Sequence, residues 1–255
     1  MMRQRPKIAI FDMTDCEGCE VVMISWLRKL LAKKTLKKDF EIVNWRLTQE
    51  AEKNSSFDVA IIEGTPVSKE EQETLKLIRE RSKYVVVLGA CAALGGINAI
   101  IEEKKRKKIK REVYGLRYKP RAIEAKPISH YIKIDGVIPG CPAVEENIEE
   151  VLSSFLADKP HKEKTYSVCF ECKEKENNCL LLQGKPCLGP ITRGGCLAPC
   201  PEFGLECYGC FGLLDGTNID AMKITLEKIL GKKKAENHLR TYLKNALEEK
   251  KNESA

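Results

Sequence analysis

The sequence of 255 residues is notable first for what it lacks. It has no run of apolar residues long enough to span a membrane, and its first residues contain no apolar segment typical of a secretory signal. The twin-arginine pattern of exported folded proteins is missing as well. These absences predict a cytoplasmic protein with no membrane span.

Nucleotide-binding patterns are also missing. Gly89, Gly95 and Gly96 follow an apolar run, but they form neither a G-x-G-x-x-G motif nor a P-loop, so we predict no nucleotide site. The only histidines are His130, His161 and His238, and none has the spacing of a metal ligand. We expect each histidine to be a surface or capping residue.

The bulk composition predicts a folded protein. Hydrophobic residues make up 43% of the chain and charged residues 32%, and the net charge of +7 is modest for this length. Such a charge does not by itself indicate a nucleic-acid partner. The basic segment at residues 102–115 fits a solvated loop or helix end, and partner docking or nucleic-acid binding are the alternatives.

Strand and helix patterns alternate along the first part of the chain. We expect strands at Lys7–Met13, Phe40–Leu47, Phe57–Gly64 and Tyr84–Cys91, and helices at Cys19–Lys34 and Ser68–Ser82, the last opening with a Ser68–Glu71 capping box. Continuous β-branched runs suit strands that are covered on both faces. The fold class is therefore α/β, with a doubly wound, mostly parallel sheet.

Composition divides the chain into three parts. Residues 1–160 carry the α/β pattern. Residues 161–216 contain eight cysteines with many glycines and prolines. This composition predicts a small irregular domain that cannot build an ordinary apolar core and must be stabilised by cross-links or bound metal instead. Residues 217–255 form a charged helical tail whose last eight residues, EEKKNESA, we expect to be frayed.

Twelve cysteines are the main chemical signal of this sequence. In a cytoplasmic chain they favour metal over disulfides, although hyperthermophile proteins are an exception, and abundant Lys and Glu with only four Gln give a weak thermophile signal. The spacings form three sets of four. Four thiolates suit an iron–sulfur cluster or a zinc ion, and the four cysteines between the two C-terminal C-x2-C pairs are more than one zinc ribbon uses. Iron–sulfur clusters, structural zinc and disulfides all stay open on spacing alone.

Five motifs occur in an order that resembles a known family. They are DCEGCE, IIEGTP, LGACAALGGI, PGCPA and CLGPITRGGC, and the resemblance covers roughly residues 7–212. The chain resembles the small, electron-transferring subunit of nickel–iron hydrogenases. It looks closest to the cytoplasmic multi-subunit branch, with the sulfhydrogenase delta subunits and the F420-reducing and F420-non-reducing hydrogenases.

The resemblance implies a set of cluster ligands. A flavodoxin-like domain would carry the proximal 4Fe–4S cluster on Cys16, Cys19, Cys91 and Cys141. The cysteine-rich domain would carry the distal 4Fe–4S cluster on Cys169, Cys172, Cys179 and Cys187, with Cys169 where many members have histidine. The medial 4Fe–4S cluster would sit on Cys196, Cys200, Cys207 and Cys210, with Cys200 where many members have proline.

The resemblance also implies a function and partners. Electrons would pass through three 4Fe–4S clusters between the nickel–iron site of a large subunit and a flavin or iron–sulfur subunit, with NAD(P), F420 or an iron–sulfur protein as acceptor. One rival is a cluster subunit of a complex I-like oxidoreductase, but the adjacent cysteine pair typical of those subunits is missing. The other rival is a zinc-stapled module that binds nucleic acid through the basic segment.

Acidic and aromatic residues near these motifs have simpler interpretations. We expect Glu63 to accept hydrogen bonds from backbone amides, with proton transfer as the alternative. Glu17 and Glu20 flank the first cysteine pair and are expected to be solvated or to face the large subunit. Trp26 and Trp45 are expected in the core or an interface.

Overall fold

The computed structural model describes residues 5–32, 40–49, 55–101, 103–117, 121–159 and 161–253. The chain forms two compact units, Met1–His161 and Lys162–Ala255. No helix in these described ranges is long and apolar enough to cross a membrane.

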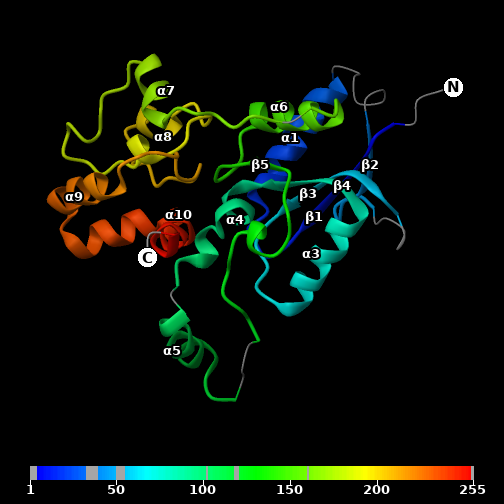
Figure 1. Ribbon diagram of the computed structural model, residues 1–255, viewed down its shortest axis with the longest axis horizontal. Coiled ribbons are helices and arrows are strands. Elements are labelled where there is room, and N and C mark those ends of the chain that lie inside the picture. The colour runs from blue at the N-terminus through cyan, green and yellow to red at the C-terminus, as the bar shows by residue number, and fades with distance from the viewer. Residues whose placement is uncertain are drawn as a thin grey trace. The chain divides into compact units, whose positions relative to one another are not determined.

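The first unit is built on a parallel sheet of five strands (Figure 1). The strand order is β2-β1-β3-β4-β5, and every neighbouring pair is parallel. This doubly wound arrangement confirms the predicted fold class. The strands are β1 (Lys7–Asp12), β2 (Glu41–Asn44), β3 (Phe57–Glu63), β4 (Ser82–Leu88) and β5 (Gly136–Ile138).

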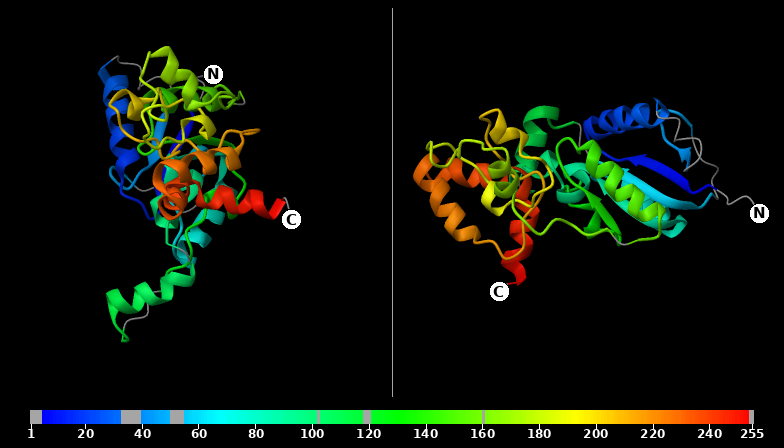
Figure 2. Two further views of the ribbon diagram at one scale, coloured as in Figure 1. Left: turned by 90° about the vertical axis from the view of Figure 1, so that its left-hand side faces the viewer. Right: turned by 90° about the horizontal axis from the view of Figure 1, so that it is seen from above.

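Helices cover both faces of this sheet. Helices α1 (Gly18–Ala32) and α6 (Glu145–Leu156) pack on one face, and α3 (Lys69–Arg81) covers the other, as Figures 1 and 2 show. Strands β3 and β4 are buried on both faces because their β-branched side chains alternate between the two cores. The core under α1 and α6 includes both Trp26 and Trp45, as expected.

Local sequence signals explain where the helices begin. Helix α3 starts with the predicted capping box: the Glu71 backbone N–H donates to Ser68 Oγ at 3.1 Å, and the Ser68 N–H donates to Glu71 Oε2 at 2.9 Å. The short helix α4 (Gly89–Leu94) follows β4 directly, and it can do so because Gly89 has a φ of +81°. Cys91 therefore lies in α4, and the predicted strand ended three residues too late.

Other boundaries also shift. The strand predicted at Phe40–Leu47 is confined to β2. The helix predicted at Cys19–Lys34 corresponds to α1, and its last two residues lie outside the described ranges. Three short 3-10 turns complete the connections, at Ile97–Ala99, Ile128–His130 and Gly189–Ile191.

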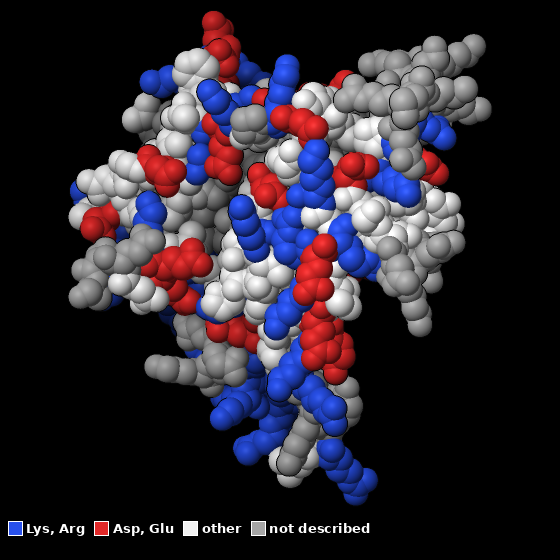
Figure 3. Space-filling model, turned by 45° about the vertical axis from the view of Figure 1, so that its right-hand side comes forward, with Lys and Arg blue, Asp and Glu red and all other residues white. Residues whose placement is uncertain are grey.

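The basic segment forms helix α5 (Glu103–Tyr114). Lys and Arg side chains gather over this helix at the lower end of the view in Figure 3. Arg106 and Lys110 are half-buried and donate hydrogen bonds to the carbonyls of Ile123 and Ala122, at 2.7 and 2.8 Å. Two of the basic residues thus attach the helix to the following loop. The other basic residues with described side chains are exposed, and a role of the helix in partner docking stays a prediction.

The second unit wraps short loops around a helical hairpin. Its cysteine-rich part contains only the short helices α7 (Val168–Glu174) and α8 (Pro199–Glu202), followed by α9 (Ile219–Leu230) and α10 (Lys232–Glu253). Figure 2 shows α9 and α10 in orange and red beside the yellow loops. Their buried side chains form one core with the loops, which includes Leu188, Ile191, Leu226, Leu239 and Leu243.

This core corrects two expectations. The cysteine-rich segment does have an apolar core, because α9 and α10 supply it from later in the sequence. The expectation of eight frayed residues at the end was wrong, since α10 continues to Glu253 and only residues 254–255 lie outside the described ranges. Leu247, just before this segment, is 9% exposed and belongs to the core.

Leu243 provides a test of this packing. Its side chain is fully buried and lies against the loop of Cys207 and Cys210, where a Cβ on Gly209 would lie 3.1 Å from Leu243 Cδ1. We expect Leu243→Ala to lower the free energy of unfolding by about 2–5 kcal/mol, because it leaves a cavity. Lys233→Ala, at an exposed position of α10, is the control, expected to change it by less than about 0.5 kcal/mol. Urea unfolding of the full chain, followed by circular dichroism, would measure both; equal midpoints would contradict the role of α10 in the core.

Candidate metal centres

Four cysteines of the first unit lie at one edge of the sheet. Cys16 follows β1, Cys19 lies in the first turn of α1, Cys91 lies in α4 after β4, and Cys141 follows β5. Because the strands are parallel, their carboxyl ends meet at the same edge. The fold thus brings together four thiols that lie far apart in the sequence.

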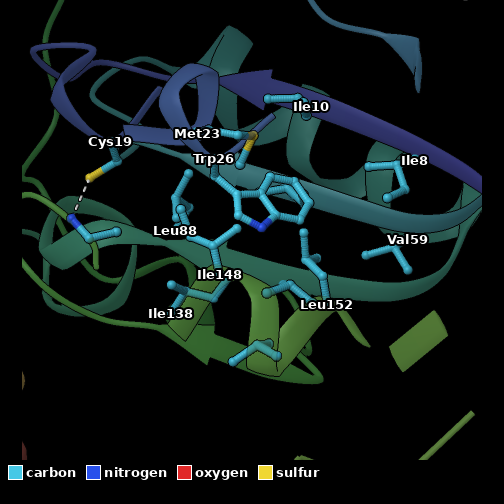
Figure 4. Close-up of a cluster of buried hydrophobic side chains, with 14 of the residues drawn as sticks. Ile8, Ile10, Cys19, Met23, Trp26, Val59, Leu88, Ile138, Ile148 and Leu152 are labelled. Atoms are coloured by element: carbon cyan, nitrogen blue, oxygen red, sulfur yellow. Dashed lines mark hydrogen bonds between the residues drawn. The ribbon is translucent and has the colours of Figure 1, made fainter. Parts of the chain in front are cut away.

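Backbone contacts join the loops that carry these thiols. The Ala90 N–H donates to the Gly140 carbonyl at 2.7 Å, which ties the Cys91 helix to the Cys141 loop. The Ala143 N–H lies 3.4 Å from Cys19 Sγ, the contact drawn as a dashed line in Figure 4. Cys19 is therefore held at the edge of the apolar core with a backbone donor directed at its sulfur.

The first cysteine pair sits in a tight turn. The Glu17 N–H donates to Asp15 Oδ1 at 2.7 Å, and Glu17 itself adopts a left-handed conformation with a φ of +60°. A Cβ on Gly18 would lie 3.3 Å from Cys16 Sγ. The turn leaves Cys16 exposed while Cys19 is buried, so the two sulfurs reach the same edge from different depths.

Glycines leave space beside two of the sulfurs. A Cβ on Gly89 would lie 2.5 Å from Cys19 Sγ, and a Cβ on Gly96 would lie 2.6 Å from Cys91 Sγ. No side chain larger than hydrogen fits at these positions without moving a thiol. The sequence around Cys91 is therefore adapted to a close approach of backbone to sulfur.

Burial and neighbouring charges oppose ionisation of Cys19 and Cys91 in the protein alone. Burial raises the pKa of Cys91 to about 12, and the neighbouring Cys141 and Cys16 act in the same direction. Burial and then the Glu63 carboxylate raise the pKa of Cys19 well above its usual range. A cationic group bound among the thiolates would compensate for this cost, because metal binding releases the thiol protons.

Two carboxylates lie beside the Cys19 turn. Glu63 is 2% exposed and accepts a hydrogen bond from the Cys19 N–H at 3.1 Å, which confirms the expected bond to a backbone amide. Burial, followed by repulsion from Asp15, raises the pKa of Glu63 to about 7. Glu20 is 1% exposed, so the expectation of a solvated side chain was wrong; it points inward from α1 because Glu20 lies one residue after Cys19 on the buried face.

In the second unit, the structure brings the first predicted set together. Burial raises the pKa of Cys169 to about 11, followed by the charges of Cys187 and Cys172, and Cys179 contributes in the same direction. A Cβ on Gly189 would lie 3.3 Å from Cys187 Sγ and 3.5 Å from Cys169 Sγ. The four thiols of this set are therefore neighbours, and the Gly189 N–H lies 3.4 Å from Cys187 Sγ.

The other four cysteines lie in two neighbouring pairs. Burial, and then the charges of Glu171 and Cys200, raise the pKa of Cys196. The hydrogen bond to Cys187 and burial raise the pKa of Cys207, and the charge of Cys210 adds to them. Cys187 also contacts this group. The Cys207 thiol donates a hydrogen bond to Cys187, which lowers the pKa of Cys187 to about 7 despite burial. Cys187 is thus placed between both predicted sets.

Two buried polar residues of this unit were missed by sequence analysis. His238 is 6% exposed, and its Nε2 lies 3.0 Å from the Cys207 carbonyl, so the expectation of a surface or capping role was wrong for His238. Glu171, inside the Cys169–Cys172 pair, is 4% exposed. The helical spacing of His238 with the apolar Ala235 and Leu239 was a usable signal; Glu171 had none, because its partners come from a distant loop.

The donor chemistry of these sites fits iron–sulfur clusters. All twelve cysteines are free thiols in this structure. Within the described residues, no three Cys, His, Asp or Glu side chains form a group that could hold a single metal ion. Four sulfurs on one zinc ion lie about 3.8 Å apart, whereas four sulfurs around a cube of iron and sulfide are farther apart. Sets of thiols with backbone donors and adjacent glycines suit the larger group.

Known proteins resemble either the first unit of this chain or nearly the whole chain. The family described as NADH ubiquinone oxidoreductase, 20 Kd subunit, matches residues 16–155. Sulfhydrogenase 2 subunit delta of Pyrococcus furiosus is 36% identical over 238 residues, which cover 92% of this chain and 98% of that protein. A vhu-type F420-non-reducing hydrogenase subunit of Methanocaldococcus jannaschii is 30% identical, and the alignment covers 82% of each chain. These matches confirm the resemblance that the five motifs indicate.

Solved structures share the fold. A chain of the actinobacterial-type NiFe-hydrogenase from Ralstonia eutropha H16 aligns with a TM-score of 0.61 and 16% identity, over 96% of this chain and 91% of that chain. A chain of an NAD+-reducing NiFe-hydrogenase aligns with a TM-score of 0.51 and 24% identity, over 62% of this chain and 96% of that chain. The likeness at these identities supports the fold class alone.

Gly89 provides a test of the edge site. We expect Gly89→Ala to push Cys19 Sγ away and to lower the metal bound per chain, because the new methyl group would lie 2.5 Å from that sulfur. Gly115→Ala is the matched control, since Gly115 has a similar φ of +70° but no atom within 4 Å of the added Cβ. Elemental analysis of both anaerobically purified variants would check this. Equal metal contents would show that Cys19 is not part of a metal site.

Proposed function

This chain belongs to the family described as the 20 Kd subunit of NADH ubiquinone oxidoreductase and, within it, to the small subunits of nickel–iron hydrogenases, and we propose that it is the electron-relay subunit of such a hydrogenase. The active site belongs to the large subunit, where hydrogen is split or formed. This chain carries electrons between that site and a flavin or iron–sulfur subunit. A cytoplasmic location stays a prediction from the sequence.

The observation that carries this proposal is the edge site. Four thiols from separate parts of the chain lie at the carboxyl edge of the sheet, with two glycines that admit no side chain beside Cys19 and Cys91. They are the four residues that the motifs assign to the proximal cluster. In doubly wound sheets this edge is where ligands bind.

The chain's own residues hold and tune the clusters. Iron–sulfur clusters supply reversible one-electron transfer when bound. Cys16, Cys19, Cys91 and Cys141 would hold the proximal cluster, and the eight cysteines of the second unit would hold the medial and distal clusters, giving three 4Fe–4S clusters. Backbone donors such as Ala143 N–H stabilise negative charge on sulfur, and the burial of Cys19, Cys187 and Cys207 shields these three ligands from water.

The second unit favours this proposal over the complex I-like alternative. The family match ends at residue 155, before the eight C-terminal cysteines. The sulfhydrogenase delta subunit, by contrast, aligns over 92% of this chain. A relay of several clusters needs these extra thiols, whereas a subunit with one cluster does not. The zinc-stapled alternative lacks a group of side chains suited to a single ion in the described residues.

Metal analysis of the native complex tests this function. After anaerobic purification, we expect nickel near one per copy of this chain, little zinc, and about twelve irons from this chain in addition to those of its partners. The iron follows from three sets of four thiols. Iron without nickel would support a relay with another catalytic partner. Zinc in place of iron would contradict the proposal.

Cys91 tests the proximal site directly. We expect Cys91→Ala to reduce hydrogen-dependent reduction of the physiological acceptor to background, because electrons leaving the large subunit would meet no proximal cluster. Isotope exchange between hydrogen gas and deuterated water serves as the internal control. This reaction requires cleavage of hydrogen at the large subunit but no net electron transfer. Exchange should persist in the assembled variant. Acceptor reduction at the wild-type rate would contradict the assignment of Cys91.

A further inference from the structure

Glu171 is a buried carboxylate between two sets of cysteines. It lies on α7 inside the Cys169-x2-Cys172 pair and is 4% exposed. Its Oε1 accepts a hydrogen bond from the Gly195 N–H at 2.6 Å and one from the Tyr166 hydroxyl at 3.3 Å. The helix that carries one cysteine pair is thereby bonded to the loop that begins the other set.

The second oxygen of Glu171 faces a thiol. Oε2 accepts from the Leu197 N–H at 2.9 Å and lies 3.8 Å from Cys196 Sγ. The two backbone donors flank Cys196 in sequence, so Glu171 fixes the loop on both sides of that sulfur. In the described ranges of the chain, no Lys, Arg or His lies within ion-pair distance of Glu171.

Three donors and no cation define the charge at this position. The Gly195 and Leu197 amides and the Tyr166 hydroxyl hold the Glu171 carboxylate in place, and no basic side chain of the described residues pairs with it. Once Cys196 binds a metal centre, its thiol proton is gone, so the carboxylate faces a sulfur that shares the negative charge of the centre. Negative charge on the Glu171 carboxylate, this close to Cys196, disfavours the addition of an electron to the centre that Cys196 binds.

We propose that Glu171 is a positioning residue that holds the Cys196 loop and lowers the reduction potential of the cluster bound by Cys196. This inference rests on the proposed function, since it requires an iron–sulfur cluster on Cys196. In this proposal, a residue other than cysteine helps to set the reduction potential of a cluster in the relay. The carboxylate makes that cluster a weaker electron acceptor than its thiolates alone would.

The test is a redox titration of the anaerobic complex, followed by paramagnetic resonance. Glu171→Gln removes the charge but keeps the shape and one carbonyl acceptor. We expect at least a tenfold increase in the reduced-to-oxidised ratio of one cluster at a fixed potential, which is about 59 mV for one electron. Glu174→Gln is the matched control, because it removes the same charge from an exposed position on the same helix and should leave every cluster unchanged.

A second variant keeps the proposal testable if Glu171→Gln does not load iron. Tyr166→Phe retains the ring that packs against Gly194 but removes one donor from the carboxylate. More negative charge is then directed at Cys196, so we expect a smaller shift in the opposite direction. Unchanged potentials in Tyr166→Phe, or in an iron-loaded Glu171→Gln, would overturn the role of Glu171.

Wild-type controls separate this inference from the proposed function. A wild-type complex without cluster signals from this chain would remove the proposed function itself. Cluster signals that are normal in wild type and insensitive to Glu171→Gln would remove only the inference. Equal shifts in Glu171→Gln and Glu174→Gln would indicate a general effect of net charge and would also overturn it.

Discussion

Ionising partly buried thiols is the constraint on which the rest of this structure depends. The thiols of Cys91, Cys169 and Cys196 have pKa values raised to between about 11 and 12, mainly by burial. A thiolate at such a site is stable only beside positive charge. The fold therefore holds these three thiols where their functional, ionised form is stabilised by a bound cationic centre, and a backbone donor near Cys196 lowers the cost of ionising that thiol.

The two units meet this constraint by different means. In the first, the parallel sheet brings the ends of β1, β4 and β5 to one edge, and most of the apolar core behind them is built without the thiols. In the second, the loops have few hydrogen-bonded elements of their own. Cys187 and Cys207 are part of the apolar core there, so the ligand loops and the helical core stabilise one another.

Sequence alone predicted the parts that depend on local pattern. The β-branched run Val85–Val87 and the Ser68–Glu71 box indicated a strand and a helix start that the structure confirms. The cysteine motifs indicated the candidate ligands. What sequence could not reveal depends on tertiary contacts: Glu171 is buried because amides 24 and 26 residues away bind it. The grouping of Cys187 stays open for the same reason, since its sulfur lies beside members of both sets.

The position of α9 and α10 after the cysteines has a consequence for biogenesis. Synthesis proceeds from the amino terminus, so all eight thiols of the second unit leave the ribosome before the helices that complete its core. During that interval the thiols are open to oxidants and to thiol–disulfide exchange. Maturation of this unit thus depends on a reducing environment around the nascent chain, well before any electron is transferred.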